Sequence, residues 1–211
     1  MSAYEDNVFI NCPFDKAYEP LLHILLFTIQ CCNFLPRTAK EINDSAQNRI
    51  DKIYGLVEQC RYGIHDISRT ELDDLNQLPR FNMPFELGVF LGAARFGNEQ
   101  QKRKRVLVLD RERYRFQRFL SDLAGIDPHV HGGDPDKLVR EVRRWLADVS
   151  RRSLPGARTI LRRYEKFQVR LPELTAQVDL EVDELSYGER LDFTAAFLAE
   201  LGHEAKTLPR D

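Results

Sequence analysis

The sequence predicts an α/β protein, with a five-stranded, mostly parallel sheet, flanking helices and a C-terminal helical extension. Short apolar runs typical of buried strands alternate with longer segments of helical periodicity, which is the pattern of a sheet built from βαβ units. The 211 residues, 43% hydrophobic and 30% charged, suffice for one domain with a full core plus an extension.

Five segments are expected to form the strands. They are residues 7–12 (NVFINC), 34–39 (FLPRTA), 62–68 (YGIHDIS), 105–110 (RVLVLD) and a short apolar segment at 127–131. Pro36 lies inside the second segment and cannot donate a hydrogen bond to a neighbouring strand. The second strand is therefore expected at an edge of the sheet.

The helices are predicted from apolar residues that recur at intervals of three and four. They are expected at 16–32, 46–60, from about 82 onward, 114–124 and 134–149. The resulting unit, residues 1–152, is a flavodoxin- or Rossmann-like arrangement. Pro155 and Gly156 mark a break, and residues 153–211 are expected to form the helical extension. In this extension Ser186 and Glu189 have the spacing of a capping box.

Charge and cysteine usage narrow the functional classes. The formal net charge of −2 provides no whole-chain attraction to nucleic acid or anionic membranes. The longest uncharged run, residues 20–36, is too short and polar for a membrane span. The four cysteines form no CxxC pair and the N-terminus lacks the pattern of a signal peptide, so a cytoplasmic location is expected.

Candidate site residues follow from the predicted sheet. Parallel sheets bind ligands at the carboxyl ends of their strands, where strand order reverses. The residues expected at that edge are Asn11, Phe14, Asp15, Arg37, Asp66 and Ser68. Glu86, in the stretch RFNMPFELG, follows the third strand and is expected to share one cleft with them. A local explanation competes, because Asn82 could cap this helix and Glu86 could complement its dipole in the first turn.

Three motifs carry a family resemblance. VFINCPFD, GIHDISR and NMPFELGVFLGA are similar in order and spacing to the nucleoside 2-deoxyribosyltransferase-like and Toll/interleukin-1 receptor-like (TIR-like) group, over about residues 7–131. The chain looks especially like an uncharacterised bacterial group that shares NCPFD, DISRTELD and RFNMPFELG. The resemblance implies N-glycosidic bond chemistry, in which Glu86 attacks or stabilises a cationic sugar carbon. Asp66 would hold sugar hydroxyls or assist proton transfer.

The resemblance also suggests ligand contacts and a substrate class. Phe9 falls within the strand-one motif, and Phe14 could stack on a base. The transferases commonly have an additional Asp shortly before the Glu, where this chain has Arg80 and Asn82. This departure argues against a deoxynucleoside, and an arginine near the pocket favours NAD or another nucleotide as substrate. No cofactor or metal is expected. The resemblance also suggests a role in antiviral defence, and the protein is expected to form a homo-oligomer.

Other interpretations remain open at this point. A non-catalytic sensor could bind a nucleotide and signal through the helical extension. A phosphoacceptor receiver domain could use Asp66, but the expected Ser or Thr after RVLVLD and the later Lys are missing. His129 and His131 could bind a metal, although no ligand set with recognisable spacing accompanies them. Cys12 could be a nucleophile, but a buried free cysteine is the better interpretation.

Overall fold

The computed structural model describes residues 4–41, 44–69 and 81–207, with side chains described as far as residue 202. Arg80 and the end of the DISRTELD motif, from Thr70 onward, lie outside the described residues.

Five parallel strands form one sheet, which confirms the α/β class. They are β1 (Asn7–Asn11), β2 (Leu35–Arg37), β3 (Tyr62–Asp66), β4 (Arg105–Asp110) and β5 (His129–Val130), in the order β2-β1-β3-β4-β5. The sequence suggested a mostly parallel sheet, and every described pairing is parallel. This is the flavodoxin-like strand order, and β2, with Pro36, lies at the edge as expected.

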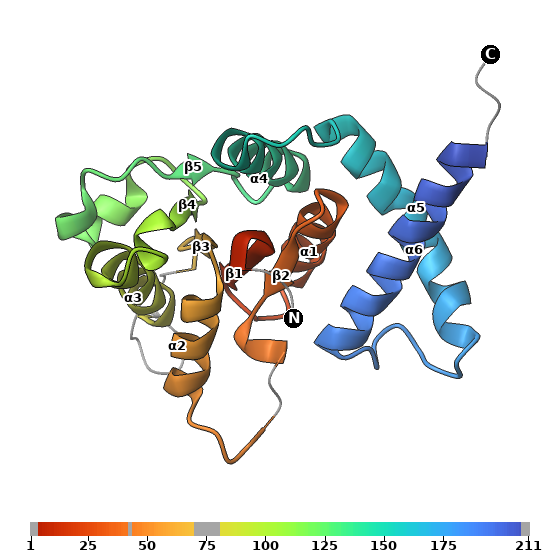
Figure 1. Cartoon of the computed structure of the whole chain (residues 1–211), viewed down its shortest axis with the longest axis horizontal. Coiled ribbons are helices and arrows are strands. Elements are labelled where there is room, and N and C mark those ends of the chain that lie inside the picture. Colours follow the sequence, from red (N-terminus) through yellow and green to blue (C-terminus); the bar gives the residue numbers. More distant parts are fainter. Residues whose placement is uncertain (1–3, 42–43, 70–80, 208–211) are drawn as a thin grey trace.

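Helices cover both faces of the sheet (Figure 1). They are α1 (Glu19–Cys31), α2 (Arg49–Gln59), α3 (Asn82–Phe96), α4 (Pro135–Ser150), α5 (Ala157–Ala176) and α6 (Tyr187–Thr207). α2 and α3 pack on one face, and α1 and α4 pack on the other. Among the described helices, none is both long and apolar enough to cross a membrane.

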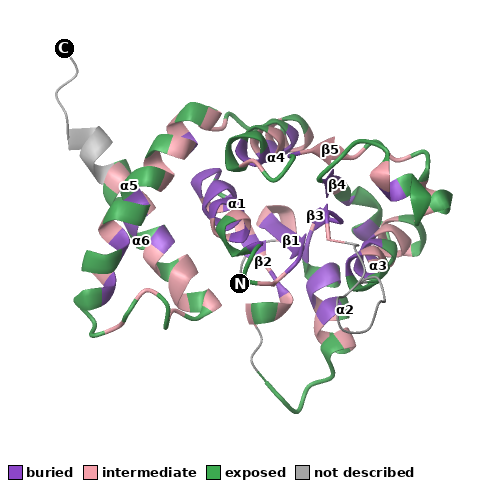
Figure 2. Cartoon of the chain, turned by 180° about the vertical axis from the view of Figure 1, so that it is seen from behind, coloured by how far each residue is buried: buried purple, intermediate pink, exposed green. Residues whose placement is uncertain are grey.

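The extension packs mainly against α1 and α4, and Tyr187 of α6 also donates a hydrogen bond to the Pro36 carbonyl of β2 at 3.2 Å. α1 is apolar around most of its circumference, as expected of a helix that is covered on both sides. Its Phe27 ring stacks on Phe167 of α5 at 5.5 Å between centroids and meets Tyr164 edge-on at 5.3 Å. Phe197 of α6 joins the same cluster. Figure 2 shows α1 almost wholly buried, whereas α5 and α6 keep exposed outer faces.

Local sequence signals define several helix starts. Asn48 caps α2 by accepting a hydrogen bond from the Ile50 N–H, and Asp134 caps α4. The capping box of α6 is confirmed: Ser186 N–H donates to the Glu189 carboxylate at 2.9 Å, and Glu189 N–H donates to Ser186 Oγ at 3.3 Å.

Two local predictions are wrong. Residues 114–124 do not form one helix but two 3₁₀ turns, Arg115–Arg118 and Ser121–Leu123, because Tyr114 is left-handed (φ 60°) and Leu120 leaves the helical region. Asn82 is not the N-cap of α3; it is the first helical residue, after Phe81. Glu86 therefore lies beyond the first turn, where the helix dipole stabilises a carboxylate little.

Candidate functional site

A cavity of about 570 Å³ opens at the carboxyl end of β1 and is large enough for a small-molecule ligand. The order β2-β1-β3 reverses at β1, so this is the position at which open α/β sheets bind ligands. The loop after β1 and the first turns of α2 and α3 complete the walls. The lining residues are Asn11, Cys12, Pro13, Phe14, Asp15, Arg49, Asn82, Met83 and Glu86.

Glu86 supplies a buried carboxyl group to this cavity. Its side chain is only 7% exposed, and the nearest described cation, Arg49 Nη2, lies 3.9 Å from Glu86 Oε1. Burial raises the pKa of Glu86 to about 7, although the positive charge of Arg49 opposes the shift. The group therefore exchanges its proton near neutral pH, as a reactive carboxyl group often does.

Asn11 fixes the cavity floor and the start of α3. Its side-chain NH₂ donates to His65 Nδ1 at 3.0 Å and to the Met83 carbonyl at 2.8 Å. Burial lowers the pKa of His65 to about 3, so the ring is neutral and can accept this bond. Because both amide protons are engaged, the Asn11 carbonyl oxygen is the group that can bind a ligand.

Asp66, the second catalytic candidate, does not line the cavity. It is fully buried and accepts hydrogen bonds from Tyr18 Oη at 2.5 Å and from Ser68 N–H at 2.8 Å. His131 Nε2 lies 3.1 Å from its Oδ2. Burial acts to raise the pKa of Asp66, but His131 and these hydrogen bonds outweigh it, so the pKa is lowered. Asp66 is thus a stably ionised acceptor that joins three parts of the chain.

Phe9 and Arg37 also lie outside the cavity. Phe9 is fully buried and stacks on Phe90 with ring centroids 6.1 Å apart, on the side of the sheet covered by α2 and α3. Arg37 binds the Glu41 carboxylate through Nε at 2.9 Å and Nη2 at 2.5 Å. It lines a separate cavity of about 550 Å³ with Tyr4 and Gln59. Ser68 is likewise buried, beside Asp66.

Phe14, Asp15 and Asn82 stand at the rim of the Glu86 cavity. The ring of Phe14 is half-buried, and Lys40 Nζ lies 5.0 Å from its centroid. Asp15 pairs with Arg69 Nη2 at 3.4 Å, and Asn82 is exposed. The structure therefore brings together five of the predicted site residues, Asn11, Phe14, Asp15, Asn82 and Glu86.

Sequence reasoning missed Arg49, which lines the cavity, and the two side chains that hold Asp66, Tyr18 and His131. Arg49 could have been found, because it follows a recognisable N-cap at a helix start that faces the ligand edge. Tyr18 and His131 carry no such signal, since their roles arise only where distant segments meet Asp66. The two histidines of HVH do not act together, because His129 pairs with Glu141 at 2.7 Å. Among the described residues, no group of three His, Cys, Asp or Glu side chains could hold a metal.

Cys12 lies in the cavity wall as a free, buried cysteine, as do Cys31, Cys32 and Cys60 elsewhere in the core. Burial, with Asp66 close by, raises the pKa of the Cys12 thiol well above its usual range. A protonated thiol is a poor nucleophile, so Glu86 is a stronger candidate than Cys12 for a reactive group in this cavity.

Comparisons with protein-family models, with curated proteins and with solved structures give no match to this chain. Fold and cavity geometry alone therefore define the class: a flavodoxin-like α/β protein with a ligand-sized cavity at the carboxyl end of β1, which the buried Glu86 side chain lines.

Proposed function

We propose that this protein cleaves an N-glycosidic bond, with NAD or a related nucleotide as substrate. The observation that carries the proposal is the Glu86 carboxyl group, buried in a ligand-sized cavity with a pKa of about 7. The resemblance of the three sequence motifs to the nucleoside 2-deoxyribosyltransferase-like and TIR-like group supports the same chemistry.

The surroundings of Glu86 suit a developing positive charge. As the C1′–N bond breaks, its electron pair leaves with the base and the sugar carbon becomes cationic. A carboxylate in a poorly solvated cavity stabilises this cation more strongly than one in water. It could also attack C1′ before water or another acceptor takes the sugar. The cation would in turn favour the ionised form of Glu86.

The position of Asp66 outside the cavity favours NAD over an ordinary nucleoside. Neutral purines and pyrimidines leave more readily when an acid protonates them, and Asp66 is not placed to do so. Nicotinamide leaves NAD as a neutral molecule and requires no proton. The four buried free thiols are compatible with a reducing compartment, and we retain a cytoplasmic antiviral role as part of the proposal.

The test is release of free base by the purified full chain, supplied with NAD and with a panel of nucleotides and nucleosides. Glu86→Gln should remove turnover while the circular dichroism spectrum is unchanged. Glu99→Gln, whose side chain is 89% exposed, is the matched control and should keep full activity. Turnover that persists in Glu86→Gln would refute the mechanism. Saturable binding without turnover by the unaltered protein would favour the sensor.

A further inference from the structure

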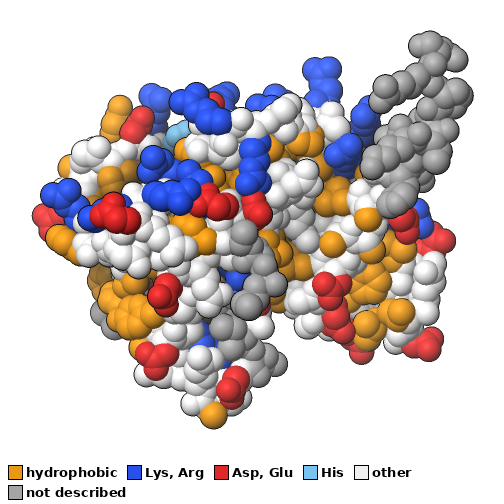
Figure 3. All heavy atoms as spheres, viewed as in Figure 1, with side chains coloured by type: hydrophobic (Ala, Val, Ile, Leu, Met, Phe, Trp, Pro, Cys, Tyr) orange, Lys and Arg blue, Asp and Glu red, His pale blue; other side chains and the backbone are white. Residues whose placement is uncertain are grey.

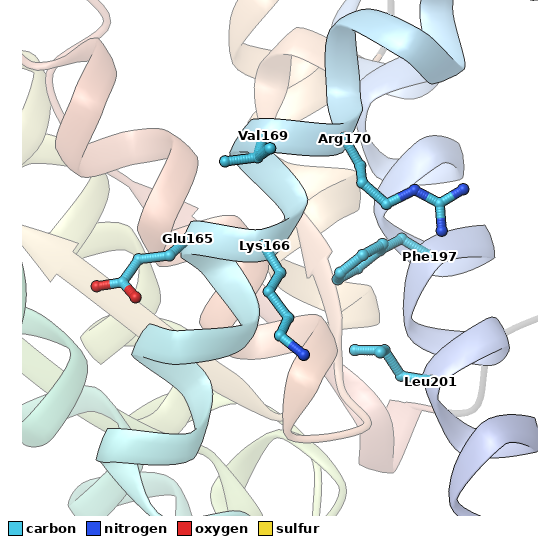
Figure 4. A pocket seen from close by; sticks show the side chains of 6 residues that line it. All are labelled: Glu165, Lys166, Val169, Arg170, Phe197 and Leu201. Carbon is cyan, nitrogen blue, oxygen red and sulfur yellow. The ribbon is translucent and has the colours of Figure 1, made fainter.

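A second concave surface lies in the extension, between α5 and α6. It is an apolar groove of about 400 Å³, lined by Glu165, Lys166, Val169, Arg170, Phe197 and Leu201. Figure 4 shows Lys166 and Arg170 extending toward α6, while Phe197 and Leu201 point back toward α5. Arg170 is held there by Glu200 at 3.2 Å. Val169 is 81% exposed, so an apolar side chain stands at the rim of the groove with no described cover.

From the start of α5 to the turn before α6, the exposed charges change from mainly basic to acidic. The first half of α5 bears the exposed basic residues Arg158, Arg162 and Lys166, together with one exposed acid, Glu165. The end of α5 and the turn before α6 bear Glu173, Asp179, Glu181, Asp183 and Glu184, all exposed. In Figure 3, basic side chains gather above the start of α5, and acidic ones gather near the turn that joins α5 to α6. The more apolar stretch around Val169 lies between the two ends.

We propose that α5 pairs antiparallel with α5 of a second copy of this chain, about a two-fold axis close to Val169. Residues 166, 169 and 173 recur at intervals of three and four, so they share one helix face. With the axis between Val169 and Arg170, Lys166 and Glu173 are equidistant from it, which places each Lys166 opposite Glu173 of the other copy. Antiparallel helix pairs use flanking charges in this way to set partner and orientation.

The exposed face of α5 is self-complementary in charge, which favours a second copy of this chain as the binding partner. In a two-fold interface each residue of the patch must meet a complementary residue of the same patch. Lys166 and Glu173 meet this condition when the helices are antiparallel, whereas a parallel pairing would bring Lys166 near Lys166 and Glu173 near Glu173 of the other copy. Val169 of each copy would pack near Val169 of the other at the axis, at the rim of the groove. The pairing does not depend on the proposed glycosidase activity.

Sedimentation equilibrium of the full chain, over micromolar to near-millimolar concentrations, tests the proposal. We expect a monomer–dimer equilibrium that Val169→Glu weakens at least about tenfold, because it buries an unpaired charge at the axis. Phe96→Glu is the matched control, since Phe96 is 85% exposed on α3, across the sheet from the extension, and should leave the dimer unchanged.

Charge exchange tests the antiparallel register. Lys166→Glu and Glu173→Lys should each weaken the homodimer, while a mixture of these two variants should form a heterodimer. The double variant should regain self-association. A monomer at every concentration, or a dimer indifferent to Val169→Glu, would overturn the proposal. Failure of the charge exchange to restore pairing would overturn the register. Circular dichroism of each variant excludes unfolding as the cause.

Discussion

Arg49 and Glu86 lie 3.9 Å apart, yet their surroundings differ: the Arg49 side chain is 63% exposed and the Glu86 side chain 7%. Water screens the arginine, so its charge does not fully offset the cost of burying a carboxylate. This asymmetry is why the pKa of Glu86 stays at about 7 despite an adjacent cation.

The burial of Glu86 predicts a stability that depends on pH. Its pKa is raised from 4.5 to about 7 on folding, so between these values the folded chain holds a proton that the unfolded chain has lost. Stability therefore falls as pH rises through this window. Glu86→Gln should remove the loss and stabilise the protein at pH 8, by at most about 3 kcal/mol. Urea unfolding at several pH values measures this, and an equal gain at pH 4 would contradict it.

Removal of the arginine should shift the pH dependence of turnover. Without the positive charge of Arg49, the pKa of Glu86 should lie above about 7. If ionised Glu86 is the active form, Arg49→Gln should reduce turnover roughly threefold to tenfold at pH 6 and less at pH 8. Lys52→Gln, a cation of the same helix that does not line the cavity, is the control. A profile of unchanged shape would show that Arg49 does not act on Glu86.

The Tyr18–Asp66 hydrogen bond should be a stability element. Tyr18→Phe keeps the buried ring but removes a donor to an ionised acceptor, which should cost about 1.5–3 kcal/mol. Because the pKa of Asp66 is lowered by folding, the loss should be present at neutral pH and fade as pH falls below the carboxyl group's ordinary range. Thermal and urea unfolding check it. Tyr54→Phe, at a 49% exposed tyrosine, should be neutral.

Two glycines provide a matched packing test. A Cβ on Gly63 of β3 would lie 2.8 Å from Phe90 Cζ and 2.8 Å from His65 Nε2, so Gly63→Ala should destabilise by about 1–3 kcal/mol. A Cβ on Gly88 of α3 would meet nothing within 4 Å. Gly88→Ala should therefore stabilise by about 0.5–1 kcal/mol through helix propensity. Unfolding free energies of the two variants should differ in sign.

The strands were predictable because each is a short, largely apolar segment, and these segments alternate along the chain with helical ones. RVLVLD is β4 over the same six residues, and Pro36 correctly indicated an edge. Errors arose where local composition did not decide the conformation. Residues 114–124 have enough apolar side chains for a helix, but they pack as two separate turns around Phe116.

The candidate site was only partly predictable, for a related reason. Strand ends placed Asn11 and Glu86 at the same edge, and the structure shows both at one cavity. The position of a residue at the end of a strand does not determine the direction in which its side chain points. Glu41, four residues along the chain, draws Arg37 away from that edge, and His131 comes from 65 positions beyond Asp66. Such pairings depend on the assembled fold.

The placement of α1 has a consequence for how the chain tolerates change. Phe27 contacts Phe167 and Phe197. Deletion of every residue after Arg152 would therefore expose the hydrophobic surface of α1 around Phe27 to solvent. A shortened chain of this kind should aggregate, and its expression in insoluble form would say nothing about chemistry at Glu86. α5 and α6 share one hydrophobic core with α1 and the sheet, so a protein that binds these two helices also stabilises the α/β unit.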